Sequence, residues 1–233
     1  MPRSGTSLFY ILLSNNLEGI EFHENEISSL KVNNKNEVCL TKRPLDCMIL
    51  PQIFDKFKDE DIKVIFCIRD PRDVICSTIA TVPHDYFIGY QNQYFFDATK
   101  GISKLNNPGI RSISTEWMKH RNNIFTLKYE DLILKREEII DQIADFLDIN
   151  LDHKQFDMTE EMKIPKGMIG ALNGLRKLDA KSIGIWKKHP VRVWEEFTNH
   201  VEFHEVMKIL NYEENEEWFL KFFIGRLPIK INF

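Results

Sequence analysis

Six residues near the start of the chain, 2–7 (PRSGTS), have the composition of an anion-binding loop, here called the first loop. The apolar run that follows them in the chain predicts a helix. Backbone N–H groups at a helix N-terminus attract anions. Gly5 allows close backbone approach, Thr6 and Ser7 add hydroxyl donors, and Arg3 adds a planar cation. The loop lacks the Lys of the GxxxxGK[ST] motif, so it is not a Walker A sequence.

A second group of anion-binding side chains follows a predicted strand. Residues 62–68 (IKVIFCI) are apolar and β-branched, which is typical of a central parallel strand, and Arg69 comes at its end. Asp70 and Pro71 indicate a helix start, because Asp caps a first turn and Pro is tolerated there. Ser77 would lie about two turns along that helix, where it could share an anion with Arg69. The alternative is an exposed cap with Arg–Asp pairs of little energetic weight.

Together, PRSGTS and RDPRDVICS resemble the corresponding segments of sulfotransferases that use 3′-phosphoadenosine 5′-phosphosulfate (PAPS). Three further segments are similar to that family: residues 40–44 (LTKRP), 127–132 (LKYEDL) and 182–188 (SIGIWKK). The sequence departs from the family at several places, two of which bear on the site. Ile185 stands where many relatives carry Arg, and only Met1 precedes the first loop. The strand that usually leads into this loop is therefore expected to be missing or shortened.

The resemblance implies a role for each matching residue. The first loop would hold the 5′-phosphosulfate through Arg3, Ser4, Gly5, Thr6 and Ser7. Arg69 and Ser77 would hold the 3′-phosphate, and Tyr129 would lie near the nucleotide. Residues 182–188, here called the late segment, would close over PAPS through Ser182, Gly184 and Trp186.

In the reaction that the resemblance implies, a hydroxyl or amine attacks the sulfur of PAPS, and 3′,5′-ADP leaves. Arg3, the loop amides and Lys42 would stabilise the developing charge, with no metal required. A base should take the acceptor proton. Glu24 is the first candidate, because it follows the short strand predicted over residues 19–23, on the expected side of the sheet. His23 and His84 are the alternatives.

The acceptor is expected to be a carbohydrate or another small molecule. Residues 82–107 and 152–174 would bind it, and they carry no diagnostic motif. Two other classes of function stay open at this point. One is a P-loop nucleotide kinase or NTPase, which would share the sheet and the loop. The other is a non-catalytic nucleotide-binding relative.

Around these residues the chain alternates short apolar strands with helical patterns. Strands are predicted over residues 19–23, 37–42, 62–68 and 124–129. Helices are predicted over residues 7–13, 46–58, from 71 onward, 113–122, 129–147 and within 191–223. Residues 82–109 are expected to form a helix plus loops, and residues 152–182 an irregular segment. The alternation is typical of an α/β three-layer sandwich with a mostly parallel central sheet, similar to P-loop NTPases.

Length and composition fit one sulfotransferase domain over residues 1–233. The formal net charge of −4 argues against a general nucleic-acid partner. The four cysteines form no CxxC pair and lack histidines at zinc spacing, so they are interpreted as buried thiols of a cytoplasmic protein. Neither a membrane span nor a signal peptide is predicted. The sequence does not indicate an oligomeric state.

Overall fold

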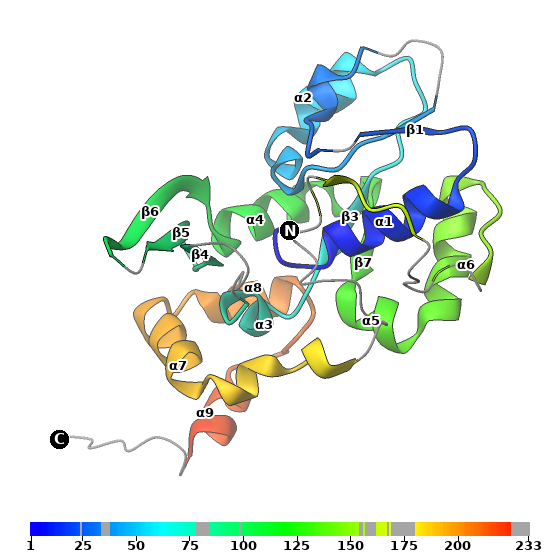
Figure 1. The fold of residues 1–233 in the computed structure, drawn as a ribbon. Coiled ribbons are helices and arrows are strands. Elements are labelled where there is room, and N and C mark those ends of the chain that lie inside the picture. Colours follow the sequence, from blue (N-terminus) through cyan, green and yellow to red (C-terminus); the bar gives the residue numbers. More distant parts are fainter. Residues whose placement is uncertain are drawn as a thin grey trace.

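The computed structural model describes residues 1–23, 25–33, 38–77, 84–97, 99–153, 156, 162–166, 168 and 180–224. Helices and strands alternate along much of the chain (Figure 1). The strands are β1 (Glu21–Phe22), β2 (Cys39–Leu40), β3 (Ile65–Ile68), β4 (His84–Ile88), β5 (Asn92–Asp97), β6 (Gly101–Pro108) and β7 (Phe125–Lys128). The α-helices are α1 (Thr6–Asn16), α2 (Leu50–Lys56), α3 (Pro71–Ile75), α4 (Ile110–His120), α5 (Tyr129–Leu134), α6 (Arg136–Leu147), α7 (Pro190–Asn199), α8 (Phe203–Ile209) and α9 (Glu217–Phe223).

The described strands pair in three small sheets. β1 pairs in parallel with β2, and β3 pairs in parallel with β7, whose Phe125 is opposite Ile65. β4, β5 and β6 form an antiparallel meander. The predicted α/β class is confirmed, and the four strands predicted from apolar runs all contain an observed strand. Those four strands are also the ones that pair in parallel.

Helix α1 is buried because its sequence is apolar almost all round. Ile11 and Leu12 have no exposed surface, and Phe9 is 5 % exposed. Phe9 and Leu12 belong to the same core cluster as Cys67 of β3 and Leu127 of β7. Figure 1 shows α1 running beside this strand pair. The first loop is thus held at the edge of the β3–β7 pair by the helix that follows it.

The turn after β3 begins a helix, as predicted, but the helix is short. Asp70 Oδ1 accepts a hydrogen bond of 2.9 Å from the N–H of Arg72, and Pro71 opens α3. The helix ends at Ile75, so the expectation that Ser77 lies within it is wrong. The N–H of Ser77 still donates to the Val74 carbonyl at 3.1 Å, because the backbone closes one final turn there. Ser77 is thereby held just beyond the helix end.

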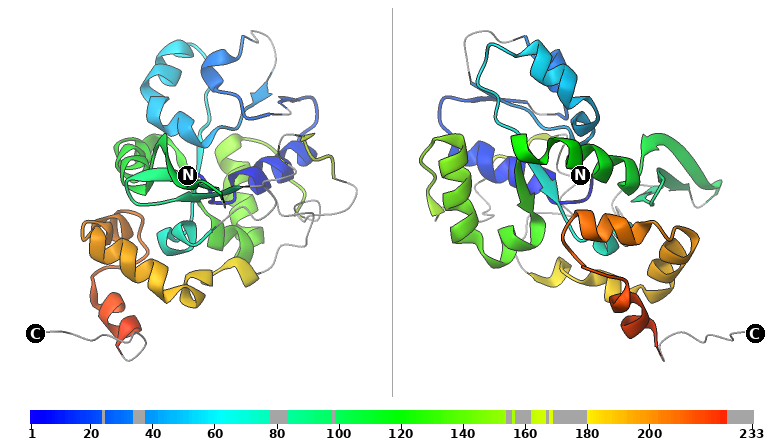
Figure 2. Two further views of the ribbon diagram at one scale, coloured as in Figure 1. Left: turned by 60° about the vertical axis from the view of Figure 1, so that its left-hand side comes forward. Right: turned by 180° about the vertical axis from the view of Figure 1, so that it is seen from behind.

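The prediction of a helix plus loops over residues 82–109 is wrong, because the described part of this segment is mainly the meander. Aromatic residues favour strands, and Phe87 stacks on Tyr94 of the neighbouring strand with ring centroids 5.2 Å apart. The turn between β5 and β6 uses Asp97, which accepts from the N–H of Thr99, and Gly101 with φ +80°. Figures 1 and 2 show the meander on the opposite side of the molecule from α6.

The single helix predicted over residues 129–147 is also wrong, because the backbone of Lys135 is not helical (φ −128°, ψ 40°) and separates α5 from α6. The C-terminal helices are confirmed, and they share one hydrophobic cluster with the chain start, which includes Met1, Ile68, Phe197 and Phe223. No helix in the described ranges is long and apolar enough to cross a bilayer.

Candidate functional site

The first loop is tied to β3 and opens α1. The N-terminal amine of Met1 donates to the Cys67 carbonyl at 2.7 Å, and Thr6 Oγ1 donates back to the Met1 carbonyl at 3.2 Å. Gly5 is the N-cap of α1 with φ +76°, and Arg3 also has a left-handed backbone with φ +62°. These contacts place the loop amides at the helix N-terminus, where an anion is favoured.

Gly5 has a second role that its sequence context does not show. A Cβ atom added at this position would lie 2.5 Å from Cδ2 of Tyr129. The Tyr129 ring, which is 9 % exposed, therefore packs directly on the loop backbone. Two constraints select glycine here: the left-handed φ and the ring that occupies the space of a side chain.

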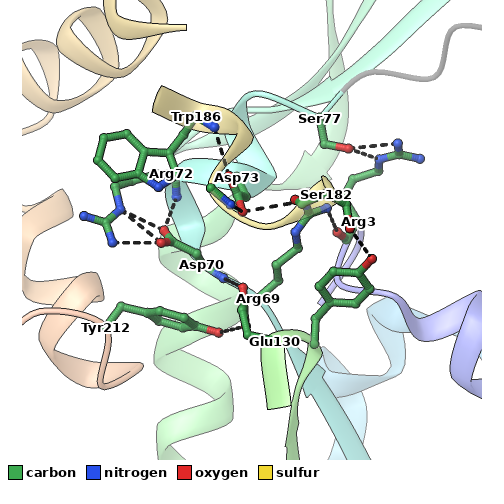
Figure 3. Close-up of polar contacts among 12 residues, drawn as sticks. Arg3, Arg69, Asp70, Arg72, Asp73, Ser77, Glu130, Ser182, Trp186 and Tyr212 are labelled. Carbon is green, nitrogen blue, oxygen red and sulfur yellow. Dashed lines mark hydrogen bonds and ion pairs between the residues drawn. The ribbon is translucent and has the colours of Figure 1, made fainter. Parts of the chain in front are cut away.

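The two anion-binding segments meet at Arg3 and Ser77 (Figure 3). Arg3 Nε and Nη2 donate to Ser77 Oγ at 3.0 and 2.9 Å. Arg69 Nη1 donates to the Arg3 carbonyl at 3.3 Å. Residues assigned from the sequence to opposite ends of the nucleotide therefore touch one another. The first loop and the turn after β3 form one site.

The late segment joins the same site through Ser182. Its Oγ lies 2.6 Å from the Tyr129 hydroxyl, and its carbonyl accepts a hydrogen bond from Arg69 Nη2. The Arg69 guanidinium also lies 4.8 Å from the Tyr129 ring centroid, in cation–π range. Arg69, Tyr129 and Ser182 come from three separate parts of the chain and are brought together here.

Asp73 holds the late segment in place. Its two carboxylate oxygens accept the N–H groups of Gly184 at 2.8 Å and Trp186 at 3.0 Å. The carboxylate is fully buried and lies 3.7 Å from Arg69 Nη2. Burial raises the pKa of Asp73, and the Trp186 N–H and the Arg69 charge oppose that rise. Gly184 has φ +72°, a left-handed conformation that favours glycine next to this carboxylate.

Arg72 of α3 packs against the tryptophan of the late segment. Its guanidinium lies over the rings of both Trp186 and Trp218, at 4.3 and 4.5 Å from their centroids. It also pairs with Asp70 at 2.7 Å and with Glu213 at 2.6 Å. The Trp186 ring is thus packed in the core against Arg72 and Trp218, while its backbone N–H binds Asp73.

Glu130 anchors the turn after β3. Its carboxylate accepts the N–H of Asp70 at 2.9 Å and the hydroxyl of Tyr212 at 2.7 Å (Figure 3). Burial raises the pKa of Glu130, and these two hydrogen bonds oppose that rise. Arg69 therefore projects from a turn that is fixed on both sides, by Glu130 and by Asp73.

A separate polar group lies where β2 ends. Lys42 is 6 % exposed, and its Nζ donates to Ser7 Oγ at 2.8 Å. The same Nζ forms an ion pair with Glu26, whose side chain is about half exposed. Lys42 thus links the first loop to an acidic side chain that reaches solvent.

Two of the three candidate bases lie within the residues that the structure describes. The N–H of His23 donates to the Tyr10 hydroxyl at 2.8 Å, and its Nε2 lies 3.6 Å from Cys39 Sγ. Glu24 lies outside the residues that the structure describes. His84 is the first residue of β4, in the meander.

Two buried donors at the site fit an anionic ligand. Ser4 is 1 % exposed and Arg69 is 6 % exposed. Within the described part of the chain, Ser4 Oγ and Arg69 Nε have no hydrogen-bond partner. Buried polar atoms are rarely left without one, because the missing bond costs about 1–3 kcal/mol. A bound phosphate would supply acceptors for both.

Sequence reasoning missed Asp73 and Glu26. Asp73 follows Arg69 by four residues, the spacing of an ion pair on a helix, and this signal is visible in RDPRD. Glu26 carries no such signal, because its partner Lys42 is 16 residues away along the chain. No group of three His, Cys, Asp or Glu side chains among the described residues could hold a metal ion.

The chain matches the family model of the sulfotransferase domain over residues 1–168. This range is more than half of the 233 residues, and the chain belongs to the sulfotransferase family. The matched range includes the first loop, Arg69, Ser77 and Tyr129, while the late segment lies beyond it. Searches of curated proteins and of solved structures found no match. The family expected from the motifs is thereby confirmed.

Proposed function

We propose that this sulfotransferase takes its sulfuryl group from PAPS and transfers it to a hydroxyl or amine, releasing 3′,5′-ADP. A carbohydrate or another small molecule is the proposed acceptor. The observation that carries the proposal is the meeting of four separate segments at Arg3, Arg69, Tyr129 and Ser182. The buried donors of Ser4 and Arg69 at this place favour a phosphorylated ligand.

The chemistry needs positioning and charge stabilisation more than covalent catalysis. The acceptor oxygen or nitrogen forms a bond to sulfur, and the bond from sulfur to the bridging oxygen breaks. That electron pair stays on the 5′-phosphate of 3′,5′-ADP. Lys42, which already reaches Ser7 of the first loop, would stabilise the charge that develops on the bridging oxygen. The amides at the start of α1 would bind the departing phosphate.

For the base, we propose Glu26 in addition to the three candidates that the sequence suggests, Glu24, His23 and His84. The Glu26 carboxylate contacts Lys42, which contacts the first loop, so it lies one side chain away from the proposed sulfuryl position. His23 instead lies beside Cys39. Glu24 stays a prediction from the sequence. Comparing the kcat of Glu26→Gln with that of Glu24→Gln decides between the two carboxylates, because only the true base should lower kcat strongly.

We also propose that residues 1–233 form one domain with the three-layer arrangement of P-loop-like proteins. The hydrophobic cluster that joins Met1 to Phe223 supports a single domain. The parallel pairing of β3 with β7, with α1 packed on it, supports the layered fold. The four cysteines are free thiols, which favours a reducing compartment such as the cytoplasm.

The test supplies labelled PAPS with sugar, alcohol, amine and peptide acceptors and follows both the label and the release of 3′,5′-ADP. We expect label on at least one acceptor and a strong loss of kcat in Lys42→Met. Phosphate transfer from ATP with Mg²⁺ would instead support the kinase alternative. Tight binding of 3′,5′-ADP without turnover on any acceptor would support a non-catalytic relative.

A further inference from the structure

The hydroxyl of a buried tyrosine in α1, Tyr10, contacts the ends of both strands that lead to the proposed reaction centre. It accepts a hydrogen bond from the N–H of His23 at 2.8 Å. It lies 2.9 Å from the His23 carbonyl and 3.3 Å from the Leu40 carbonyl, and the single hydroxyl hydrogen is shared between these two acceptors. His23 directly follows β1, and Leu40 ends β2. The hydroxyl therefore ties both strand ends to α1.

The pair formed by β1 and β2 is too short to fix these ends by itself. Its register joins two residues of one strand to two of the other. Among the described strands, neither β1 nor β2 pairs with a third. Isolated two-stranded pairs are at best marginally stable in water. The path of the chain beyond each strand should therefore depend on the contacts that Tyr10 adds there.

The groups proposed for the chemistry lie in the chain that leaves these two strands. Lys42 comes two residues after Leu40, and its Nζ donates to Ser7 Oγ at 2.8 Å. Glu26 comes three residues after His23 and forms an ion pair with the same Nζ. Each member of this ion pair is thus close in sequence to a backbone group that the tyrosine hydroxyl contacts.

Helix α1 contacts this region at two points on one face. Ser7 and Tyr10 are three residues apart, a spacing that places their side chains on the same side of a helix. Ser7 contacts the Lys42 ammonium, and Tyr10 contacts the strand ends. The Tyr10 ring belongs to a small hydrophobic cluster with Ile11, against which Leu40 packs. A phenylalanine would fill the same space, so the packing alone does not account for the hydroxyl.

We infer that Tyr10 is a positioning residue for sulfuryl transfer, whose hydroxyl holds Lys42 and Glu26 at the first loop. The inference rests on the proposed use of PAPS and on the proposed roles of these two side chains. Tyr10 acts through the backbone of His23 and Leu40. The contacts at the turn after β3, proposed to bind the nucleotide, do not pass through these hydrogen bonds. Nucleotide binding and catalysis should therefore respond differently when the hydroxyl is removed.

The test is the Tyr10→Phe variant, which removes one oxygen atom. Transfer of label from PAPS is followed to the sugar, alcohol, amine or peptide that the wild type labels best. We expect kcat to fall by about 10- to 100-fold, the loss that follows when a reacting group is misplaced by about 1 Å. The KM for PAPS, and the Kd of 3′,5′-ADP from titration calorimetry, should each change less than about twofold.

Amide hydrogen exchange provides a second measurement, which needs no acceptor. The N–H of His23 donates to the Tyr10 hydroxyl, so it should exchange faster in Tyr10→Phe, while the amides of β3 keep their rates. If the variant is unstable by itself, the exchange is measured in its complex with 3′,5′-ADP, which stabilises the folded state by mass action.

Ser14→Ala is the matched control on the same helix. Ser14 is also buried, and its Oγ donates to the Ile11 carbonyl at 3.1 Å, within α1. This variant should keep kcat within about twofold of the wild type. Adding Lys42→Met to Tyr10→Phe should lower kcat by less than the product of the two single losses, because the tyrosine acts through the lysine.

Three results would contradict the inference about Tyr10 alone. These are an unchanged kcat in Tyr10→Phe, an equal loss in Ser14→Ala, and single losses that multiply fully in the double variant with Lys42→Met. A parallel fall in kcat and in affinity for 3′,5′-ADP would also overturn it, because it indicates a general loss of structure. A wild type that transfers no label to any acceptor contradicts the proposed function, and the inference fails with it.

Discussion

Replacing Gly5 with Ala tests how the first loop is packed. The new Cβ would lie 2.5 Å from the Tyr129 ring, on a backbone with φ +76°. The left-handed conformation costs a residue with a side chain about 1–2 kcal/mol. Overpacking against the buried ring costs about 1–3 kcal/mol more. Gly5→Ala should therefore destabilise the fold by about 2–5 kcal/mol, or on the order of 10 °C in Tm for a chain of this length.

Gly19 provides a matched control. Its φ is +70°, and a Cβ added there would meet nothing within 4 Å. Gly19→Ala should carry only the backbone cost of about 1–2 kcal/mol. Urea denaturation of both variants measures the difference, which isolates the contact with Tyr129. Equal destabilisation of the two variants, within about 0.5 kcal/mol, would refute the packing of Tyr129 on the loop.

Three other predictions concern the surroundings of the site. Asp73→Asn should lower the free energy of unfolding by about 2–3 kcal/mol, because an NH2 donor replaces one of the two oxygens that accept the N–H groups of Gly184 and Trp186; an unchanged urea midpoint contradicts this. Lys42→Met should lower kcat for PAPS far more than it raises KM, and the reverse pattern counts against its role. Burial raises the pKa of Cys67 to about 11, so about one thiol in a thousand is ionised at pH 8. Iodoacetamide should therefore modify Cys39 first, and Cys67 only as the pH rises or the protein unfolds.

Local patterns predicted the elements that carry the site. The helix after PRSGTS and the Asp-Pro helix start were readable because capping and apolar periodicity act between near neighbours. The family resemblance then placed Arg69, Tyr129 and Ser182 near one ligand, and the structure brings these three together. The meander is not predicted: residues 82–109 are interpreted as a helix plus loops, although Asp97 and Gly101 signal a turn.

Long-range contacts could not be predicted from the sequence. Asp73 binds amides of residues 184 and 186, and the Arg3 side chain crosses to Ser77; neither partner is determined by local spacing. The break at Lys135 has no Gly or Pro to mark it. These features depend on tertiary packing, which outweighs local preference. They are also the features that distinguish this site from a simple capped helix.

The central claim is that the first loop and the turn after β3 form one site for a nucleotide with a 3′-phosphate. Titration calorimetry of the wild-type protein with 3′,5′-ADP, 5′-AMP and ATP with Mg²⁺ tests it most directly. We predict that 3′,5′-ADP binds at least about tenfold more tightly than either other nucleotide, the effect of one charged contact or more. Equal affinities for 3′,5′-ADP and 5′-AMP, or a preference for ATP with Mg²⁺, would contradict the account.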